Sequence, residues 1–507
     1  MSRARRSIGP AGDVTSGAYD VIVVGGGSSG GVVAARMSED AACRVLLVEA
    51  GPDLPDHPRG RGTMFSSGSM LGEYWSGIAS PTAELDWGFE SEPLSNGRRV
   101  QLMRGRLVGG SGMTNGCVFV QGRPEDFARW EGCGAVGWGW SDVKPFYDAV
   151  RREVPIMTYP RDRWLPFDHL LVAGALDLGF EYVEDLDAPS AWDGVTGPWP
   201  RNRRNEIRQS SNVAYLRPAR ERSNLVVQAD ALVDRLVLRG DRVTGIRWID
   251  ASGRCHFAEG DHIVLSAGAY GSAPILLRSG IGPAQELRLL GIEPRVDLPV
   301  GQGLMDHPAT SLIVRLDPEH VMLGWPCFAA VVRGRGWWTL PVPLDEEEGV
   351  AALSLCMAIA EGPEGGYIRL RSADPNEPPE IFHGYERFLG AGGFDSAMAD
   401  WQRLLETPAF RAAGVRDTRA KLTLRESALR GLGTGAHPVG GCAIASVVDE
   451  RLSVHGIEGL TVADASVFPR NVTNNPNFTC FMIGERAAAF LRAAPGRQLT
   501  ASEESAW

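Results

Sequence analysis

The chain contains a glycine-rich segment whose residue types and spacing suit the binding of a dinucleotide. Gly25-Gly26-Gly27-Ser28-Ser29-Gly30 matches G-x-G-x-x-G and directly follows the β-branched run Tyr19–Val24. Glycines at these places permit a tight turn, close approach of the backbone to a pyrophosphate, and close packing of a helix on a strand. Glu49 lies about 20 residues further on, where a carboxylate accepts hydrogen bonds from ribose hydroxyls. The fingerprint by itself does not distinguish FAD from NAD.

A second glycine cluster spans residues 104–116. Its side chains are too small to build a core, so its exposed backbone amides are its useful feature. Such a segment either lies against a planar ring or a diphosphate, or is a flexible surface loop.

The elements around these segments indicate a parallel sheet. Residues 19–24 and 43–48 are short apolar runs without alternation, which is typical of strands buried on both faces, and residues 31–40 between them are expected to form a helix. The runs 262–269 and 460–464 have the same pattern. Between about 300 and 430 the pattern changes, and segments 328–332, 350–360 and 367–370 predict an antiparallel sheet in a second, inserted domain.

Composition excludes several classes of protein. A length of 507 residues indicates two or three domains, and the net charge of −11 without a basic cluster argues against a nucleic-acid partner. Apolar stretches fall short of the ~20 residues of a spanning helix, so no membrane span is expected. The eight cysteines are scattered without a C-x-x-C pair, so we expect no metal site and a cytoplasmic protein with reduced thiols. Residues 1–17 lack a signal-peptide core and are expected to be a disordered lead-in.

Four segments together resemble the glucose–methanol–choline (GMC) oxidoreductase family of FAD-dependent enzymes. They are residues 19–51, 104–122, 265–308 and 437–485. The last is the most specific, with His437-Pro438-Val439-Gly440-Gly441-Cys442 followed by Asn475-Pro476. The resemblance covers nearly the whole chain. It implies an α/β fold, with a Rossmann-like FAD-binding domain and an α+β substrate domain that contains an antiparallel sheet.

The activity implied by the resemblance is oxidation of a primary or secondary alcohol to the carbonyl, with hydride transfer to flavin N5. By the family pattern His437 is the catalytic base and Asn475 its partner. The chemistry needs these residue types, because the substrate hydroxyl must lose a proton and its oxygen must be oriented. His307, in Asp306-His307-Pro308, is expected to have a structural role, and Trp325, Trp337 and Trp338 are expected in the core or at an interface more than around the substrate.

The resemblance also implies which residues bind FAD. They are Gly25, Gly27, Ser28, Ser29, Gly30, Glu49, Ala50, Val108, Gly110, Asn115, Gly116, Val118, Val233, Ala267, Gly268, Asp464, Ala465 and Pro476. Some family members bind FAD covalently through a histidine in the second glycine cluster. Thr114 occupies that place here, so noncovalent FAD is expected.

The implied organisation alternates between the two domains. The expected segments are a lead-in (1–17), the FAD-binding domain in three parts (18–160, 216–310 and 431–507), a cap segment (161–215) and the substrate-binding domain (311–430).

Several questions stay open from the sequence. The small-molecule alcohol is not identified, and either oxygen or another acceptor reoxidises the flavin. One alternative is a non-redox hydroxynitrile lyase on the same fold, and another is an NAD-linked dehydrogenase, which rests only on the shared fingerprint. If the tryptophans line the pocket, an apolar or aromatic alcohol, or a cation, is favoured.

Overall fold

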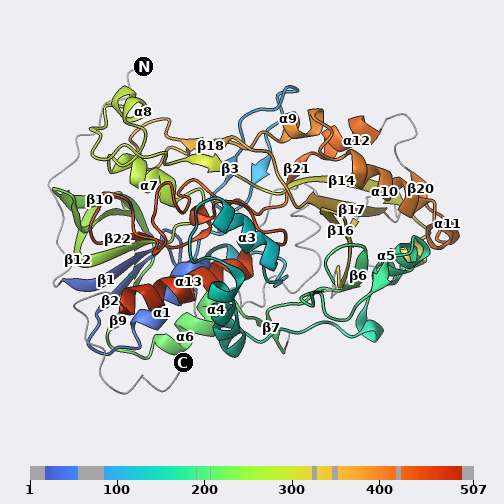
Figure 1. Cartoon of the computed structure of the whole chain (residues 1–507), viewed down its shortest axis with the longest axis horizontal. Coiled ribbons are helices and arrows are strands. Elements are labelled where there is room, and N and C mark those ends of the chain that lie inside the picture. Colours follow the sequence, from blue (N-terminus) through green and yellow to red (C-terminus); the bar gives the residue numbers. More distant parts are fainter. Residues whose placement is uncertain are drawn as a thin grey trace.

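The computed structural model describes residues 18–54, 85–189, 191–205, 207–321, 328–344, 352–417 and 424–493. A mainly parallel sheet lies at one end of the molecule and an eight-stranded sheet at the other (Figure 1). The lead-in 1–17 and Trp325 fall outside the described residues. The seven cysteines among the described residues form no disulfide. Within the same residues, no helix has the length and apolar character needed to cross a membrane.

The parallel sheet contains the nucleotide-type strands. Its strands are β1 (Tyr19–Val24), β2 (Val45–Val48), β9 (Leu225–Gln228), β10 (Ala231–Arg239), β11 (Arg242–Asp250), β12 (Cys255–Leu265) and β22 (Leu460–Val462). The parallel order is β22-β12-β1-β2-β9, and the first half of β12 continues into an antiparallel meander with β11 and β10. All four residues of β2 are buried, as the lack of alternation predicts.

Two helices cross closely beside this sheet. Helix α1 (Ser28–Met37) follows the first glycine turn, and α13 (Asn477–Arg492) follows Asn475. A Cβ at Gly484 of α13 would lie 2.7 Å from the carbonyl oxygen of Ser29, so the glycine allows the helices to touch.

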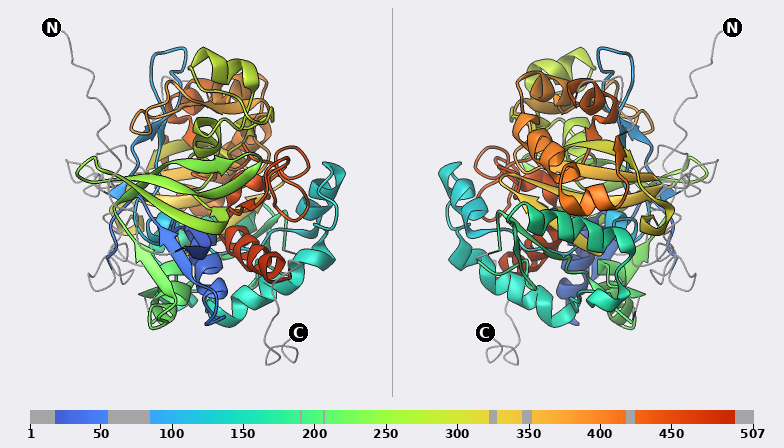
Figure 2. Two further views of the ribbon diagram at one scale, coloured as in Figure 1. Left: turned by 90° about the vertical axis from the view of Figure 1, so that its left-hand side faces the viewer. Right: turned by 90° about the vertical axis from the view of Figure 1, so that its right-hand side faces the viewer.

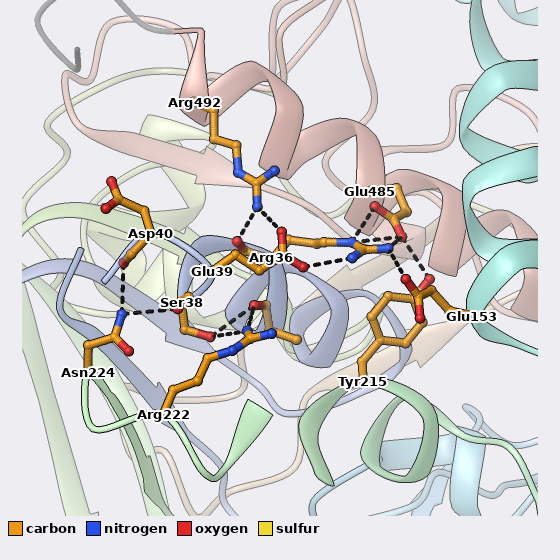
Figure 3. A network of polar contacts seen from close by, with 11 residues as sticks. Arg36, Ser38, Glu39, Asp40, Glu153, Tyr215, Arg222, Asn224, Glu485 and Arg492 are labelled. Carbon is orange, nitrogen blue, oxygen red and sulfur yellow. Dashed lines mark hydrogen bonds and ion pairs between the residues drawn. The ribbon is translucent and has the colours of Figure 1, made fainter. Parts of the chain in front are cut away.

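A partly buried charge network fixes this crossing (Figure 3). The Arg36 guanidinium on α1 donates to Glu485 on α13 at 2.9 Å and to Glu39 at 2.7 Å. It also pairs with Glu153 of α4 (Trp140–Glu153) at 2.9 Å, and the Tyr215 hydroxyl donates to Glu485 at 2.7 Å. The network therefore joins α1, α4 and α13 into one unit.

The second large sheet is almost entirely antiparallel. Its strands are β5 (Glu181–Tyr182), β6 (Val195–Pro198), β14 (Pro308–Arg315), β15 (Ala330–Gly334), β16 (Trp337–Leu344), β17 (Ala352–Ile359), β20 (Arg416–Asp417) and β21 (Gly433–Thr434). The order is β20-β14-β17-β16-β15-β6-β5, with β21 also paired to β14. Helices α5 (Pro166–Asp177), α10 (Asp395–Leu405), α11 (Pro408–Ala412) and α12 (Leu424–Gly431) lie over its outer face (Figure 2).

The remaining elements are short. They are β3 (Phe89–Glu90), β4 (Gln101–Leu102), β7 (Arg203–Arg204), β8 (Ile207–Arg208), β13 (Gln302–Leu304), β18 (Gly366–Arg369), β19 (Glu380–Phe382), α3 (Pro124–Gly132), α6 (Arg217–Ala219), α7 (Ser272–Arg278), α8 (Ala284–Leu289), α9 (Tyr385–Gly390), the π-helical turn Asn212–Leu216, and the 3₁₀ turns Gly110–Met113, Arg161–Arg163, Pro318–His320 and Ala465–Val467.

The expected α/β fold class, with its Rossmann-like domain and its antiparallel sheet, is confirmed. Of the segments expected in the antiparallel sheet, residues 330–332 belong to it in β15 and residues 352–359 in β17. Segment 367–370 does not, because β18 pairs with β13 and β19 in a separate three-stranded sheet. The segment boundaries stay a prediction, although β5 and β6 place part of the expected cap segment within the eight-stranded sheet.

Candidate active site

A cavity of about 490 Å³ lies where the carboxyl ends of the parallel strands meet the eight-stranded sheet. This is where open α/β sheets bind their ligands. The predicted residues that line it are Gly25, Gly27, Ser28, Ser29, Glu49, Ala50, Gly110, Asn115, Gly116, Val118, Val233, Ala267, Gly268, His437, Asp464, Ala465, Asn475 and Pro476. Gly30 and Val108 lie outside the lining.

The first glycine turn leaves room for a ligand at one of its glycines. Gly25 has a φ of +98°, and a Cβ there would lie 2.4 Å from the Ser266 carbonyl oxygen, so only glycine fits. A Cβ at Gly27 would meet no protein atom within 4 Å, and Gly27 lines the cavity. The backbone at Gly27 is therefore open to close approach by a phosphate.

The two predicted residues outside the lining have packing roles. A Cβ at Gly30 would lie 2.0 Å from the Gly25 carbonyl oxygen, so this glycine lets α1 pack against the end of β1. Val108 is 1% exposed and belongs to the main hydrophobic core. These residues shape the loops beside the cavity without facing it.

The second glycine cluster is packed on the first. The Gly109 amide donates to the Gly26 carbonyl at 2.7 Å, and a Cβ at Gly110 would lie 2.8 Å from the Gly27 Cα. The buried Arg208 guanidinium donates to the Gly112 carbonyl at 3.1 Å. This segment is therefore part of the cavity wall, and the alternative of a loose surface loop is wrong.

Glu49 has the environment of a ribose-binding carboxylate. Its Oε2 accepts a hydrogen bond from the Gly26 amide at 2.8 Å, and its Oε1 accepts one from the Gly51 amide at 3.0 Å. Burial raises the pKa of Glu49 to about 7 even though these amides favour the ionised form. Each carboxylate oxygen has a second lone pair for a ribose hydroxyl.

Asp464 holds a neighbouring loop in place. Its carboxylate accepts hydrogen bonds from the Gly268 amide at 2.8 Å, the Ser272 hydroxyl at 2.6 Å and the Ser466 amide at 2.7 Å. These bonds tie the loop after β12 to the loop after β22. Asp464 thus fixes Ala267 and Gly268 at the cavity wall.

The two helix N-termini meet at the cavity and provide donors for an FAD. The Ser28 hydroxyl donates to Oδ1 of Asn477 at 2.7 Å, which links the first residues of α1 and α13. Asn477 lines the cavity, and within the described structure its buried Nδ2 has no hydrogen-bond partner. This unsatisfied donor, the open space at Gly27 and the positive helix ends fit a bound FAD.

His437 lies beside a second histidine because of strand register. Strand β21 pairs with β14, with Thr434 opposite Pro308, and this pairing brings His437 next to His307. The two Nδ1 atoms are 3.0 Å apart, and Nε2 of His307 is 2.9 Å from the Val472 carbonyl oxygen. A carbonyl only accepts, so His307 Nε2 carries the proton and its Nδ1 accepts from the Nδ1–H of His437. The Nε2 of His437 therefore has a free lone pair.

Both imidazoles are held in the neutral form. Burial lowers the pKa of His307 to about 4. Burial, the adjacent His307 and the Arg104 guanidinium lower the pKa of His437 well below its ordinary value. His437 is thus available as a proton acceptor at neutral pH.

Asp306 fixes the backbone around His437. Its Oδ1 accepts a hydrogen bond from the His437 amide at 2.8 Å, and its Oδ2 accepts from the Tyr385 hydroxyl at 2.6 Å and from the Thr434 hydroxyl. Asp306 is completely buried. The loop that carries His437 is thereby fastened to β14 and α9.

Asn475 also lines the cavity. Its Nδ2 donates to the Val118 carbonyl at 2.7 Å, which fixes the amide plane and leaves a second N–H on the same nitrogen. Its buried Oδ1 has no partner among the described residues. The side chain is therefore oriented with hydrogen-bonding capacity in reserve.

Sequence reasoning missed an aromatic wall and one arginine. Trp199, Phe328 and Trp338 line the cavity, and Arg104 lines it and donates to the Ala436 carbonyl beside His437. Trp338 is buried in a hydrophobic cluster, as expected of a core residue, but it also lines the cavity. Strand alternation could have predicted this position, because neighbouring residues of a strand point to opposite faces. Trp337 donates its Nε1–H to Asp400 at 3.1 Å, while the adjacent Trp338 lines the cavity.

The expectation of a structural role for His307 leaves out one contact, because His307 is hydrogen-bonded directly to His437. The sequence offered a weak signal in the Asp306-His307-Pro308 segment. Its meaning depended on the pairing of β14 with β21, which joins segments 130 residues apart.

The cavity joins the glycine-rich turns of a parallel sheet to an oriented neutral histidine, an arrangement that suits a nucleotide-dependent oxidoreductase. Two sequence profiles of the family described as GMC oxidoreductase match residues 19–309 and 363–484. The chain therefore belongs to the GMC oxidoreductase family. It is an FAD-dependent oxidoreductase of the kind that acts on CH–OH groups.

Named relatives match along nearly the whole chain. Choline oxidase from Arthrobacter globiformis is 30% identical, with 96% of each chain covered. Oxygen-dependent choline dehydrogenase from Rhizobium meliloti (strain 1021) is 29% identical, with 96% of this chain and 98% of the relative covered. Among solved structures, pyridoxine 4-oxidase from Mesorbium loti has a TM-score of 0.81 at 24% identity, covering 93% of this chain and 98% of that chain. The last likeness shows the shared fold.

Proposed function

We propose that this enzyme oxidises a primary or secondary alcohol to its carbonyl, with His437 as the base that removes the hydroxyl proton. The observation that carries the proposal is the hydrogen-bond chain Val472–His307–His437, because it leaves the lone pair of His437 Nε2 free. A neutral imidazole in reach of the substrate hydroxyl is the group this step requires.

Asn475 orients the substrate oxygen in this proposal. One N–H of its amide is used by Val118, so the other is available to the substrate oxygen without competing for its proton. Bound FAD supplies the acceptor for the hydride that leaves the carbinol carbon.

We infer that FAD is bound noncovalently. Thr114 lines the cavity at the place where some family members have a histidine, and a neutral hydroxyl is a poor nucleophile toward a flavin. Acid precipitation of the protein is expected to leave the yellow colour in the supernatant. Colour that remains in the protein pellet would contradict noncovalent binding.

We also infer that the protein works in a reducing compartment such as the cytoplasm. The described cysteines are free, and Cys43, Cys117, Cys356, Cys442 and Cys480 are buried. Secretion of the full chain from its native host would contradict this inference.

The test is anaerobic reduction of the flavin by a panel of alcohols. His437→Ala is expected to slow reduction by about 10³-fold while FAD stays bound, because it removes the proton acceptor. His455→Ala, which changes an exposed histidine away from the cavity lining, is the matched control and is expected to have no effect. Unchanged reduction in His437→Ala would overturn the assignment of the base.

The same experiment separates the open alternatives. Admitting air after reduction measures whether oxygen reoxidises the flavin directly or another acceptor is needed. Cleavage of a cyanohydrin with the flavin still oxidised would select the lyase, and release of a nicotinamide on denaturation would select the NAD-linked dehydrogenase.

A further inference from the structure

The part of the cavity beside His437 has an apolar wall. The lining residues that belong to one hydrophobic cluster are Val118, Trp199, Ala309, Phe328, Trp338, Leu340, Cys356 and Ala358. Most of them come from the eight-stranded sheet or its connections. This wall favours a substrate whose body is apolar.

The carboxylates that line the described cavity belong to other parts of it. Glu49 follows β2 and Asp464 follows β22, so both are at the ends of the parallel strands. Glu377 lies in the connection between β18 and β19, outside the eight-stranded sheet. Among the described residues, therefore, no carboxylate belongs to the apolar wall.

Two aromatic rings of this wall already have an arginine guanidinium over one face. The Arg201 guanidinium lies over the Phe328 ring at 4.6 Å from its centroid, and the Arg333 guanidinium lies over the Trp199 ring at 5.4 Å. Aromatic faces are what proteins use to hold quaternary ammonium groups. Here an arginine guanidinium already lies over one face of the Phe328 ring and of the Trp199 ring. An ammonium group that packed on either ring would therefore approach a like charge.

A third cation lies next to the base. Arg104 lines the cavity, donates to the Ala436 carbonyl, and contributes to the low pKa of His437. A substrate cation placed near His437 would be repelled by the same guanidinium.

Carboxylates also lie near these cations, but they do not line the cavity: Asp187 near Arg333, Asp306 on the backbone of His437, and Asp168 near Arg201. Asp168 is buried behind the wall and accepts hydrogen bonds from the Ala330 amide at 3.1 Å and the Leu165 amide at 3.3 Å. It does not line the cavity, and burial raises its pKa to about 7, so it carries only part of a charge at neutral pH.

Trp338 gives the wall a flat surface beside the catalytic histidine. Its ring centroid is 6.2 Å from that of His437 at an interplanar angle of 35°, and 4.9 Å from that of His307 at 86°. Within the described structure, no arginine guanidinium lies over the Trp338 ring. A planar ring attached to the carbinol carbon can pack here with its hydroxyl directed to His437.

We propose that the substrate is a neutral alcohol with an aromatic or bulky apolar body, and that the positive surroundings of the wall reject quaternary ammonium alcohols. This proposal rests on the proposed function of His437. It separates the chain from the relatives that are named for choline, although these are 29–30% identical to it. The neutral wall supplies affinity, and the arginines supply discrimination against cations.

The decisive experiment compares two alcohols of the same shape and different charge. Choline and 3,3-dimethylbutan-1-ol differ in whether nitrogen or carbon is at the centre of the trimethyl group. We expect anaerobic flavin reduction in the holoenzyme to show a kcat/KM for the neutral alcohol at least about 100-fold above that for choline. Benzyl alcohol is expected to exceed both, because its ring can pack on Trp338.

The outcomes distinguish this proposal from the proposed function. Reduction by choline as fast as by its neutral isostere would overturn the charge discrimination and leave alcohol oxidation by His437 intact. Reduction by 3,3-dimethylbutan-1-ol faster than by benzyl alcohol would overturn the aromatic preference alone. If no alcohol of the panel reduces the flavin, both the proposed function and this inference are overturned.

A carboxylate introduced into the apolar wall tests whether electrostatic repulsion causes the discrimination against choline. Leu340 lines the cavity from β16 and is half-buried, so Leu340→Glu adds a carboxylate there and Leu340→Gln adds a neutral group of the same shape. The measured quantity is the kcat/KM for choline divided by the kcat/KM for 3,3-dimethylbutan-1-ol, at pH 8.5. We expect this ratio to rise at least tenfold in the Glu variant and to change less than threefold in the Gln variant. An equal ratio in the two variants, with FAD bound in both, would overturn the electrostatic explanation.

Discussion

The two ends of the cavity are built by different physical means. At the dinucleotide end, the wall is backbone: glycines whose Cβ atoms would collide with neighbouring carbonyls, helix N-termini, and carboxylates that accept amide hydrogen bonds. At the substrate end, the wall is side chains of an antiparallel sheet, with cations behind its rings. The first end suits a ligand shared by many proteins, while the second can change from one relative to another without disturbing the first.

Glycine substitutions at the dinucleotide end are expected to have the largest effects, and they should separate folding from binding. Gly30→Ala forces a Cβ to within 2.0 Å of a backbone oxygen, so we expect a loss of about 3 kcal/mol or more in the free energy of unfolding. Gly27→Ala meets no protein atom and should keep the stability of the apoprotein while losing most bound FAD. Denaturant unfolding and the flavin-to-protein absorbance ratio measure the two effects. Equal stability of the two apoproteins would contradict this division of roles.

Removal of the Arg36 network should weaken the dinucleotide end through its helices. Arg36→Met leaves Glu485, which is 7% exposed, without its cation, and we expect a loss of about 3 kcal/mol in the free energy of unfolding. Arg152→Met on the exposed side of α4 is the matched control, with an expected change below about 0.5 kcal/mol. Urea denaturation of both variants provides the comparison. A similar small loss in both would show that the network contributes little.

At the substrate end, His307 is expected to act through the tautomer of His437. His307→Leu removes the acceptor for the Nδ1–H of His437, so we expect flavin reduction to slow by about 100-fold with FAD still bound. His307→Gln offers an amide oxygen to His437 and an N–H to Val472. Its flavin should therefore be reduced at least tenfold faster than that of the Leu variant. Stopped-flow reduction at saturating alcohol measures both rates. Equal rates in the Leu and Gln variants would assign His307 to packing alone.

The smallest expected effect is the response of the wild-type rate to pH. The pKa of His437 lies well below its ordinary value of 6.5, and the proton acceptor is the neutral form. Its contribution is therefore fully present above pH 6.5 and is lost only as the pH falls further, so the reduction rate should change less than about twofold between pH 8 and pH 6.5. A rate that halves with an apparent pKa of 6.5 or higher in this range would show that His437 is not desolvated in the working enzyme.

The dinucleotide end was largely predictable because its signals are local. The strand Tyr19–Val24, the glycines after it and Glu49 lie within about 30 residues, and each residue type has one physical reason at its place. Even so, Gly30 and Val108 proved to pack beside the cavity and not to line it, because a glycine or valine in a motif does not reveal which of its sides faces the ligand.

The sequence by itself determined the nucleotide fold, the family and the identity of His437 and Asn475 as candidates, because these depend on short motifs. Only the tertiary structure decided which groups surround them. The pairing of β21 with β14 joins His307 to His437 across 130 residues, and the eight-stranded sheet turns Trp338 toward the cavity and Trp337 away from it. Such contacts depend on strand register between distant segments, where a shift of one residue exchanges the two faces of a strand.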